Sequence, residues 1–350
     1  MLEKFFGKFS HDLGIDLGTA NTLVYAKEKG IIINEPTIVA VNTRSDQIVA
    51  IGAESRKMLG KTPSHIEVIR PLVDGVISNF EVTEKMLRYF IEKAQRDGAS
   101  FRPRPRVVIG VPLDITEVER KAVEDATLSA GAREVFLVEE PMAAAIGARL
   151  PIKDPSASLV LDIGGGTTEI AVISLGGVVT TRSLRIAGDV FNRNVAQYIR
   201  DHFNLLIGDI TAENIKINIG SVVEIDGGRE IQVRGRDIIS GLPREITVTD
   251  AQVRDALSKN IKIIIENIKL TLEETPPELV ADIYEKGIVL TGGGALLYGL
   301  EKLIYQATQI PVTIADDPLT CVARGTGMIV EDFEHFKDIG IPPSNEMRVI

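Results

Sequence analysis

The sequence predicts an α/β protein made of two related halves, each with a sheet whose strands lead into a turn suited to an anion. The apolar residues 159–161 and 170–173 flank Asp162 and the glycines 164–166, a pattern typical of two buried strands joined by a tight turn. A similar stretch occurs 146 residues earlier, around Asp16. A third glycine turn, at 292–294, follows the strand-like residues 287–290 and precedes a helical pattern.

The glycines and the aspartate of the 159–173 stretch indicate a phosphate ligand with a divalent cation. Glycine lets backbone N–H groups turn toward an anion, because there is no Cβ in the way. A carboxylate at a strand end, such as Asp162, would repel a bare phosphate by about 1 kcal/mol even in a water-like dielectric. We therefore expect a cation between the two, and Mg²⁺ fits because it keeps several waters and uses few protein carboxylates.

The repeat indicates that both halves contact one ligand. Asp16 corresponds to Asp162 and Gly18 corresponds to Gly164. A glycine triplet alone more often only turns the chain, but two copies with an aspartate at the same place favour a site. The third glycine turn, placed before a helix N-terminus, predicts a second anion or nucleotide site.

The other patterns predict strands and helices in alternation. In the first half we expect strands over 31–40, 48–51, 107–110 and 134–138 and a helix over 82–96. Thr116 and Glu119 form a capping box for a helix that ends at Gly131. In the second half we expect a helix over 189–203, a hairpin around 226–228 and a long helix over 250–274, followed by a flexible tail from Asp338.

The composition indicates a globular chain with two cores. The 350 residues are 44% apolar and 25% charged, and no run of 18 apolar residues or secretory signal is present, so we expect a cytoplasmic protein. The single cysteine, Cys321, excludes an internal disulfide and is expected to be buried. A net charge of −10 argues against nucleic acid as a partner.

These motifs together resemble the actin and Hsp70-type ATPase superfamily, and from about Asp12 to Val330 the chain is similar to the MreB family of bacterial actins. Further matching stretches are 34–36, 70–71, 74–77, 108–112, 139–145 and 275–279. The resemblance implies a duplicated actin-like ATPase fold, with two large domains around a nucleotide cleft and a small subdomain on each. It also implies ATP and Mg²⁺ as cofactors.

The resemblance divides the chain into segments. Residues 1–11 form an amphipathic membrane segment, residues 12–146 the first half with a small insertion at about 34–75, residues 147–335 the second half with an insertion at about 209–248, and residues 336–350 a flexible tail.

The resemblance also implies the roles of individual residues. Glu140 would orient or deprotonate the attacking water, Thr167 would lie near that water, and Asp16 and Asp162 would hold Mg²⁺ largely through water. Phosphate contacts fall on Thr19, Ala20, Asn21, Gly164, Gly165 and Gly166; ribose and adenine contacts on Glu213, Asn214, Ile215 and Lys216; and adenosine contacts on Gly292, Gly293, Gly294 and Ala295.

Structural alternatives exist for several of these residues. Glu139 and Glu140 could be surface acids that interact favourably with the dipole of a following helix, and Glu213 could be a solvated helix residue. The stretch 188–192 also departs from the family, because Val190 and Asn192 stand where carboxylates are usual. This departure puts the ordering of water, and hence the hydrolysis rate, in doubt.

Residues 2–9 predict a membrane contact. If they are helical, Leu2, Phe5, Phe6 and Phe9 share one face, and Lys4 and Lys8 flank it. We interpret this segment as an anchor in the membrane interface; the alternatives are a helix packed on the body of the protein and a frayed terminus. One copy would bind weakly, so a polymer that presents many copies is expected.

The resemblance implies a filament-forming ATPase that directs cell shape and cell-wall elongation. It would form head-to-tail protofilaments, paired and bound to the inner face of the cell membrane, with transmembrane morphogenesis and wall-synthesis proteins as partners. The alternatives are a small-molecule kinase and an Hsp70-type chaperone of the same superfamily. A kinase needs an aspartate base in an acceptor pocket, and a chaperone needs a long region after the ATPase, whereas some 20 residues follow Val330.

Overall fold

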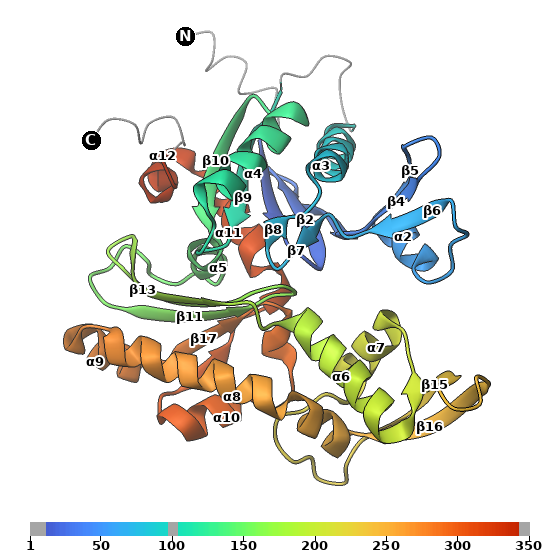
Figure 1. Cartoon of the computed structure of the whole chain (residues 1–350). Coiled ribbons are helices and arrows are strands. Elements are labelled where there is room, and N and C mark those ends of the chain that lie inside the picture. Colours follow the sequence, from blue (N-terminus) through green and yellow to red (C-terminus); the bar gives the residue numbers. More distant parts are fainter. Residues whose placement is uncertain (1–11, 97–103, 343–350) are drawn as a thin grey trace. The chain divides into compact units, whose positions relative to one another are not determined.

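A computed structural model describes residues 12–96 and 104–342 (Figure 1). The chain forms two compact units. Unit 1 contains Met1–Pro155, Ile173–Val178 and Leu319–Ile350, and unit 2 contains Ser156–Val172 and Val179–Pro318.

Each of the two main sheets has five strands in the same arrangement. The first has the order β10-β9-β1-β2-β3, and the second has the order β13-β12-β11-β17-β18. In both, three strands that follow one another in sequence are joined by two later strands, and these run parallel to the first of the three. The two related α/β halves expected from the repeat are therefore confirmed. The strands are β1 (Leu13–Leu17), β2 (Asn21–Ala26), β3 (Gly30–Pro36), β9 (Arg106–Val111), β10 (Glu134–Glu139), β11 (Ser158–Ile163), β12 (Thr168–Ser174), β13 (Gly177–Leu184), β17 (Ile288–Thr291) and β18 (Val312–Ile314).

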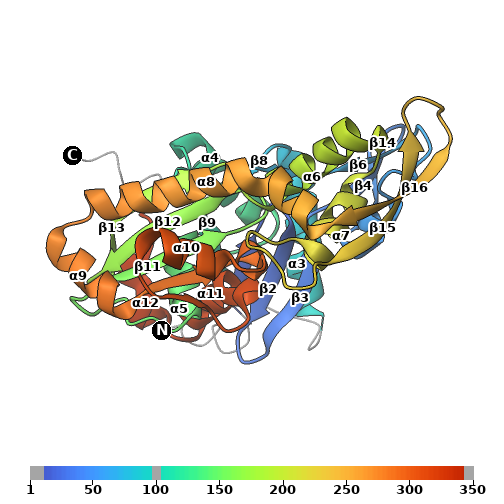
Figure 2. The same cartoon turned by 90° about the horizontal axis from the view of Figure 1, so that it is seen from below.

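Smaller sheets accompany these. A three-stranded sheet with the order β5-β4-β6 and a short β7-β8 pair belong to unit 1, and a three-stranded sheet with the order β14-β15-β16 belongs to unit 2. Figures 1 and 2 show the β15-β16 hairpin projecting from one end of unit 2. These strands are β4 (Val39–Asn42), β5 (Gln47–Ile51), β6 (Ile66–Ile69), β7 (Leu72–Val73), β8 (Val76–Ile77), β14 (Leu205–Leu206), β15 (Glu230–Asp237) and β16 (Pro243–Thr249).

Helices cover the sheets of each unit. In unit 1, α3 contacts β2 and β3, whereas α11 contacts β1, β2 and β9; in unit 2, α6 packs between α7 and α8. The helices are α2 (Ala53–Met58), α3 (Phe80–Gln95), α4 (Glu117–Ser129), α5 (Glu140–Gly147), α6 (Gly188–Phe203), α7 (Asp209–Ile219), α8 (Asp250–Glu274), α9 (Pro277–Lys286), η1 (Gly293–Leu296), α10 (Leu300–Thr308), η2 (Pro318–Thr320), α11 (Cys321–Glu331), α12 (Phe333–Phe336) and η3 (Lys337–Ile339).

Most of the expected elements form, and the chemistry at their ends explains their bounds. The capping box of α4 is present, with Glu119 N donating to Thr116 Oγ1 at 3.2 Å and Thr116 N donating to Glu119 Oε2 at 2.9 Å. Two expectations need correction. The strand expected over 31–40 is two strands, because it is interrupted after Pro36, which has no N–H to donate. The hairpin expected around 226–228 turns instead at 238–242, and 226–227 form a turn that precedes β15.

A close crossing of α5 and α11 holds the C-terminal helix to unit 1. A Cβ on Gly147 would lie 1.9 Å from Cys321 O, and one on Gly325 would lie 1.8 Å from Ala143 O. On the sheet side, a Cβ on Gly14 would lie 2.7 Å from Thr326 Oγ1. The backbones approach to distances that only glycine permits, so residues 319–331, although far from β1 in sequence, complete the unit that contains β1.

Two further expectations concern the ends of the chain, the flexible tail and the N-terminal anchor. Residues 337–339 form η3, and Ile341 N donates to Leu137 O at 2.9 Å, so this part of the expected tail is attached to β10. The expected anchor, residues 2–9, lies outside the described residues. Within the part of the chain that the structure describes, no helix is both long and apolar enough to cross a membrane.

Candidate functional site

The turn between β1 and β2 contains the first group of candidates. A Cβ on Gly18 would lie 2.7 Å from Asn21 O, so the turn requires glycine there. Thr37 Oγ1 donates to Gly18 O at 2.6 Å, and Gly75 N donates to Thr19 Oγ1 at 2.9 Å. The turn that contains Thr19, Ala20 and Asn21 is therefore fixed by neighbours from two other segments, which suits a rigid cradle.

Asp16 and Glu140 reach the same edge of the first sheet. In the parallel register, Asp16 of β1 pairs with Gly110 of β9, and Gly110 pairs with Val138 of β10. A Cβ on Gly110 would lie 3.3 Å from Glu140 Cγ, so the Glu140 side chain lies over the end of β9. Strand spacing of about 4.8 Å places the β1 and β10 backbones about 10 Å apart at this edge.

Glu140 lies at the junction between a strand and a helix. β10 ends at Glu139 and α5 begins at Glu140, with Pro141 in its first turn. Glu140 is 9% exposed, and burial raises the pKa of Glu139. The Glu140 carboxylate is therefore buried, whereas the alternative interpretation required a solvated surface acid.

In unit 2, Asp162 joins two of the predicted motifs. It lies at the end of β11 in register with Thr291 at the end of β17, and Thr291 Oγ1 donates to Asp162 Oδ1 at 2.7 Å. Asp162 is 5% exposed. Burial raises its pKa to about 6, although the Thr291 hydrogen bond acts in the opposite direction.

The glycine turn after β17 packs directly on this strand end. A Cβ on Gly292 would lie 2.4 Å from Ile163 O and 2.8 Å from Asp162 Oδ1, and one on Gly294 would lie 2.2 Å from Ile163 Cγ2. Gly292 also has a φ of +76°, a region that favours glycine. Of the four adenosine candidates, Gly292, Gly293 and Gly294 form this turn, and Ala295 is buried in the core of unit 2.

The second phosphate turn contacts the N-terminus of α6. Gly164 N donates to Thr167 O at 2.9 Å, which closes the turn around Gly165 and Gly166. Gly188 N donates to Gly164 O at 3.1 Å, and Asp189 N donates to Gly165 O at 2.8 Å. The start of the helix is thus attached to the turn, and Thr167 is 8% exposed within it.

Lys216 reaches the same place from α7. Its Nζ donates to Gly188 O at 3.1 Å, and burial lowers its pKa, an effect that Glu213 and Asp189 oppose by charge. Glu213 and Lys216 are three residues apart and share a face of α7. Asn214 is exposed on another face, and Ile215 packs in the hydrophobic core.

Unit 2 therefore gathers Asp162, the turns 164–167 and 292–294, Glu213 and Lys216 around the start of α6. Sequence reasoning did not include Thr291 or Gly188 among the site residues, yet each contacts a candidate. The signal for Thr291 was available, because it stands at the end of the 287–290 strand pattern as Asp162 does at the end of its own.

A family model described as MreB/Mbl protein matches residues 10–338. The chain belongs to the MreB/Mbl family. Among curated MreB/Mbl proteins, the cell shape-determining protein MreB of Escherichia coli (strain K12) is 52% identical over 337 residues, which cover 95% of this chain and 96% of the relative. The cell shape-determining protein Mbl of Bacillus subtilis (strain 168) is 48% identical over 326 residues, covering 93% and 97%.

Solved structures of the family and of a more distant relative share the fold. MreB5 of Spiroplasma citri bound to AMPPNP superposes with a TM-score of 0.88 at 37% identity and covers 94% of this chain and 98% of its own. MamK, solved as a double helical filament, gives a TM-score of 0.78 at 24% identity, covering 91% and 98%, which shows the fold alone. The expected membership of the bacterial actins is confirmed.

Proposed function

We propose that this chain is an ATP-binding and ATP-hydrolysing bacterial actin that forms membrane-associated filaments and determines cell shape. The observation that carries the proposal is the group around Asp162, where a buried carboxylate, two glycine turns and a half-buried lysine lie near one helix start. A family member, MreB5 of Spiroplasma citri, has been solved with AMPPNP, a nucleotide analogue. The curated relatives are named for cell-shape determination.

Backbone groups would bind most of the nucleotide. The turns 19–21 and 164–166 would offer backbone N–H groups to the phosphates. The turn 292–294, where a Cβ at 292 or 294 would clash with Ile163, would lie against the adenosine. Of residues 213–216, Glu213 and Lys216 would contact the ribose and base, whereas Ile215 is buried in the core. An anion beside Lys216 would act against the burial that lowers its pKa.

The donor set fits Mg²⁺ that is held mainly through water. Among residues 12–96 and 104–342, no group of three or more His, Cys, Asp and Glu side chains could hold a metal ion directly. Mg²⁺ commonly binds to one or two carboxylates and to substrate phosphates, and Asp16 and Asp162 would provide those carboxylates. The ion would supply neutralisation of the charge that develops on phosphoryl transfer.

Glu140 would act on the attacking water. A buried carboxylate that accepts a proton, or that fixes the orientation of the water, is what hydrolysis requires of the protein, and Thr167 would hold the same water from the second phosphate turn. The kinase alternative lacks a comparable observation, because Glu140 is a glutamate at a helix start rather than an aspartate in an acceptor pocket.

Assembly on the membrane completes the proposal. We infer head-to-tail protofilaments that pair on the inner face of the cell membrane, contact lipid through residues 2–9, and work with transmembrane morphogenesis and wall-synthesis proteins. Electron microscopy of the purified protein with ATP and Mg²⁺ on anionic lipid tests this. Filaments on the lipid are expected; monomers under all nucleotide conditions would contradict the filament function.

A further inference from the structure

The two aspartates of the repeat have different neighbours on the adjacent strand. In the parallel registers, Asp162 of β11 pairs with Thr291 of β17, whereas Asp16 of β1 pairs with Gly110 of β9. Thr291 Oγ1 donates to Asp162 Oδ1 at 2.7 Å, and a glycine has no side chain that could donate in the same way. The two halves therefore repeat their carboxylates but not the residue beside each carboxylate.

In unit 1 the space beside the aspartate is needed by other side chains. A Cβ on Gly110 would lie 3.0 Å from Val322 Cγ1 and 3.3 Å from Glu140 Cγ. A threonine at this place would displace the Glu140 side chain, since its Cβ carries two further heavy atoms. The same sheet position thus leaves room for a carboxylate in unit 1 and supplies a hydroxyl group in unit 2.

The Thr291 hydroxyl has a fixed position. Thr291 is fully buried, and the backbone on each side of it is hydrogen-bonded to the segment 315–318. Leu290 O accepts from Ala315 N, and Gly292 N donates to Pro318 O, both at 2.9 Å. A β-branched side chain has few χ1 rotamers, so a fixed backbone also fixes the direction of its hydroxyl group.

This hydroxyl group restricts a carboxylate that would otherwise turn easily. The last side-chain torsion of an aspartate has a broad energy minimum, so a fixed backbone alone does not determine where its two oxygens lie. In Asp162 the Oδ1 atom accepts from Thr291, and Gly292 packs so closely that a Cβ there would lie 2.8 Å from the same oxygen. Oδ1 is therefore held against β17, which leaves Oδ2 for a ligand.

We propose that Thr291 is a positioning residue that orients the Asp162 carboxylate for the Mg²⁺ complex of the nucleotide. The inference rests on the proposed nucleotide site and adds a residue to it. Thr291 is buried and contacts neither ion nor nucleotide; it acts by holding Oδ1, so that Oδ2 faces a water molecule of the Mg²⁺ shell. Removal of such an outer hydrogen-bond partner commonly lowers metal affinity by about 10–100-fold.

The test measures how much Mg²⁺ strengthens nucleotide binding by the full chain. We define the Mg²⁺ enhancement as the dissociation constant of ADP in chelator divided by that in Mg²⁺, both from calorimetric titration. Thr291→Val keeps the shape of the side chain and removes the donor, so it is expected to lower the enhancement by about tenfold. Its affinity in chelator should stay within about twofold of wild type, and Thr291→Ser, which keeps the hydroxyl group, should restore the enhancement.

Thr271→Val is the matched control. Thr271 is also fully buried in unit 2, and its Oγ1 donates to Asn267 O at 2.8 Å, within α8. Both valine variants lose one buried hydrogen bond, so the melting temperature is expected to fall in both. Thr271→Val should nevertheless keep the wild-type Mg²⁺ enhancement, which separates positioning of Asp162 from a general loss of stability.

A double-mutant cycle tests whether Thr291 acts through Asp162. In the Asp162→Asn background, Thr291→Val should have no further effect on the Mg²⁺ enhancement. Equal effects in both backgrounds would overturn the inference, and so would a wild-type enhancement in Thr291→Val or a loss in Thr291→Ser as large as in Thr291→Val. If Thr291→Val does not fold, Thr291→Cys, with a weaker donor of similar size, replaces it under the same criteria. A wild-type chain that binds no nucleotide with or without Mg²⁺ would overturn the proposed site itself.

Discussion

Asp162 is placed where its own negative charge is disfavoured. The β11 strand end buries it, and one hydroxyl donor, Thr291, compensates only in part, so its pKa rises from 3.8 to about 6. A fold selected for stability alone would place an apolar or amide side chain here. The proposed role of Asp162 in binding a cation would explain why this destabilising carboxylate is present. For one variant, Asp162→Asn, it predicts a gain in stability without ligand and a loss of Mg²⁺-dependent nucleotide affinity.

The first concerns the nucleotide-free protein in a metal chelator. Because the pKa of Asp162 is raised in the folded state, ionisation of its carboxyl group destabilises the folded protein. This destabilisation is absent below about pH 3.8 and fully present above about pH 6. Asp162→Asn should therefore stabilise the apo protein at pH 7.5, by up to about 3 kcal/mol for a shift of two units, with a smaller gain at pH 5. Denaturant unfolding at the two pH values measures this; an equal gain at both would remove ionisation as the cause.

The second concerns ligand binding by the same variant. Without the carboxylate, Mg²⁺ loses a water-bridged partner, so Asp162→Asn should weaken nucleotide binding in the presence of Mg²⁺ by about tenfold or more, as expected for loss of a charged interaction. Affinity measured with chelator should change much less. Calorimetric titration showing the same Mg²⁺-dependent affinity as wild type would exclude Asp162 from the metal site.

Glu140 gives a prediction on turnover. Glu140→Gln keeps the shape of a side chain that is 9% exposed but removes its capacity to accept a proton. Hydrolysis should slow by about 10²-fold or more, the usual scale for a positioned base, while nucleotide affinity stays near that of wild type. Single-turnover phosphate release checks this, with Glu139→Gln as the neighbouring control; a normal rate in Glu140→Gln would exclude Glu140 from the chemistry.

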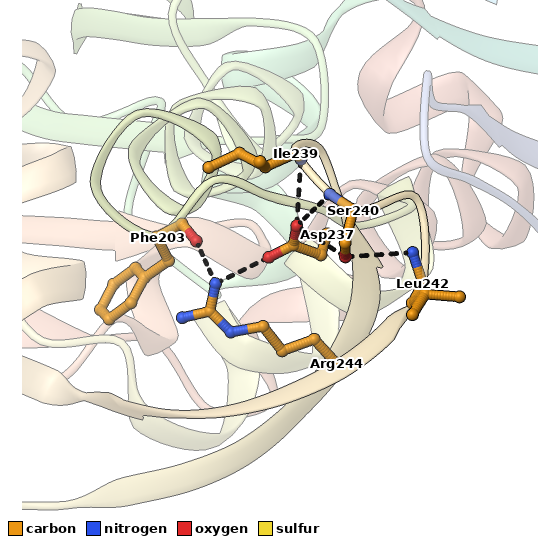
Figure 3. Close-up of polar contacts among 6 residues, drawn as sticks. All are labelled: Phe203, Asp237, Ile239, Ser240, Leu242 and Arg244. Atoms are coloured by element: carbon orange, nitrogen blue, oxygen red, sulfur yellow. Dashed lines mark hydrogen bonds and ion pairs between the residues drawn. The ribbon is translucent and has the colours of Figure 1, made fainter.

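At the scale of elements, local sequence patterns predicted the features that local interactions determine, such as a helix start and the buried face of a helix. The start of α4 follows from the Thr116–Glu119 capping box, and the buried face of α8 from the spacing of its isoleucines. The strand break after Pro36 was readable in principle, because proline cannot donate to a ladder. The hairpin turn at 238–242 was missed because the glycine pair at 227–228 gave the stronger turn signal. The Asp237 side chain that builds the real turn accepts from Ser240 N, three positions on, and from Arg244 in the facing strand (Figure 3), so a local signal was present.

In the candidate site, too, local patterns found the motifs but not the contacts between distant segments. The glycine turns and Asp162 could be found from the sequence, because each follows a strand pattern. The meeting of Lys216 with Gly188 could not, since the two lie 28 positions apart on different helices and no periodicity connects them. Nor could spacing show that Ile215, next to Lys216, faces the core.

The crossing of α5 and α11 supports a prediction about packing. In Gly325→Ala the new Cβ would lie 1.8 Å from a backbone carbonyl, so the helices must separate. We expect a loss of about 3 kcal/mol or more, at the upper end of overpacking effects. Gly177→Ala, where the nearest heavy atom would be 3.9 Å away, is the control and should change stability by less than about 0.5 kcal/mol. Thermal unfolding compares the two; equal melting temperatures would show that the crossing relaxes freely.

For the whole molecule, the net charge and the proposed N-terminal anchor would act in opposite directions at a membrane. The −10 charge repels anionic lipid, but this repulsion is spread over the surface and screened within about 8 Å at physiological salt. Burial of Leu2, Phe5, Phe6 and Phe9 in the membrane interface would act locally, at about 1.5–3 kcal/mol for each fully buried side chain before the cost of ordering the segment. A filament would multiply the small remainder.

Deletion of residues 2–9 should therefore abolish co-sedimentation of filaments with anionic liposomes and leave ATP turnover unchanged. Phe5→Asp with Phe6→Asp should have the same effect without shortening the chain. The control is pelleting without lipid, which should match wild type. If the shortened protein still sediments with liposomes, the lipid contact lies on another part of the chain.

The contribution of residues 319–331 to unit 1 has a consequence during synthesis. The ribosome releases the N-terminal residues first, yet β1 and α5 lack the helix that covers them until α11 emerges. Unit 2, which ends at Pro318, is complete before that moment. The nascent chain must therefore keep an unfinished apolar surface exposed while almost all of its length is translated, and a message truncated before codon 321 would yield a unit 1 that cannot close.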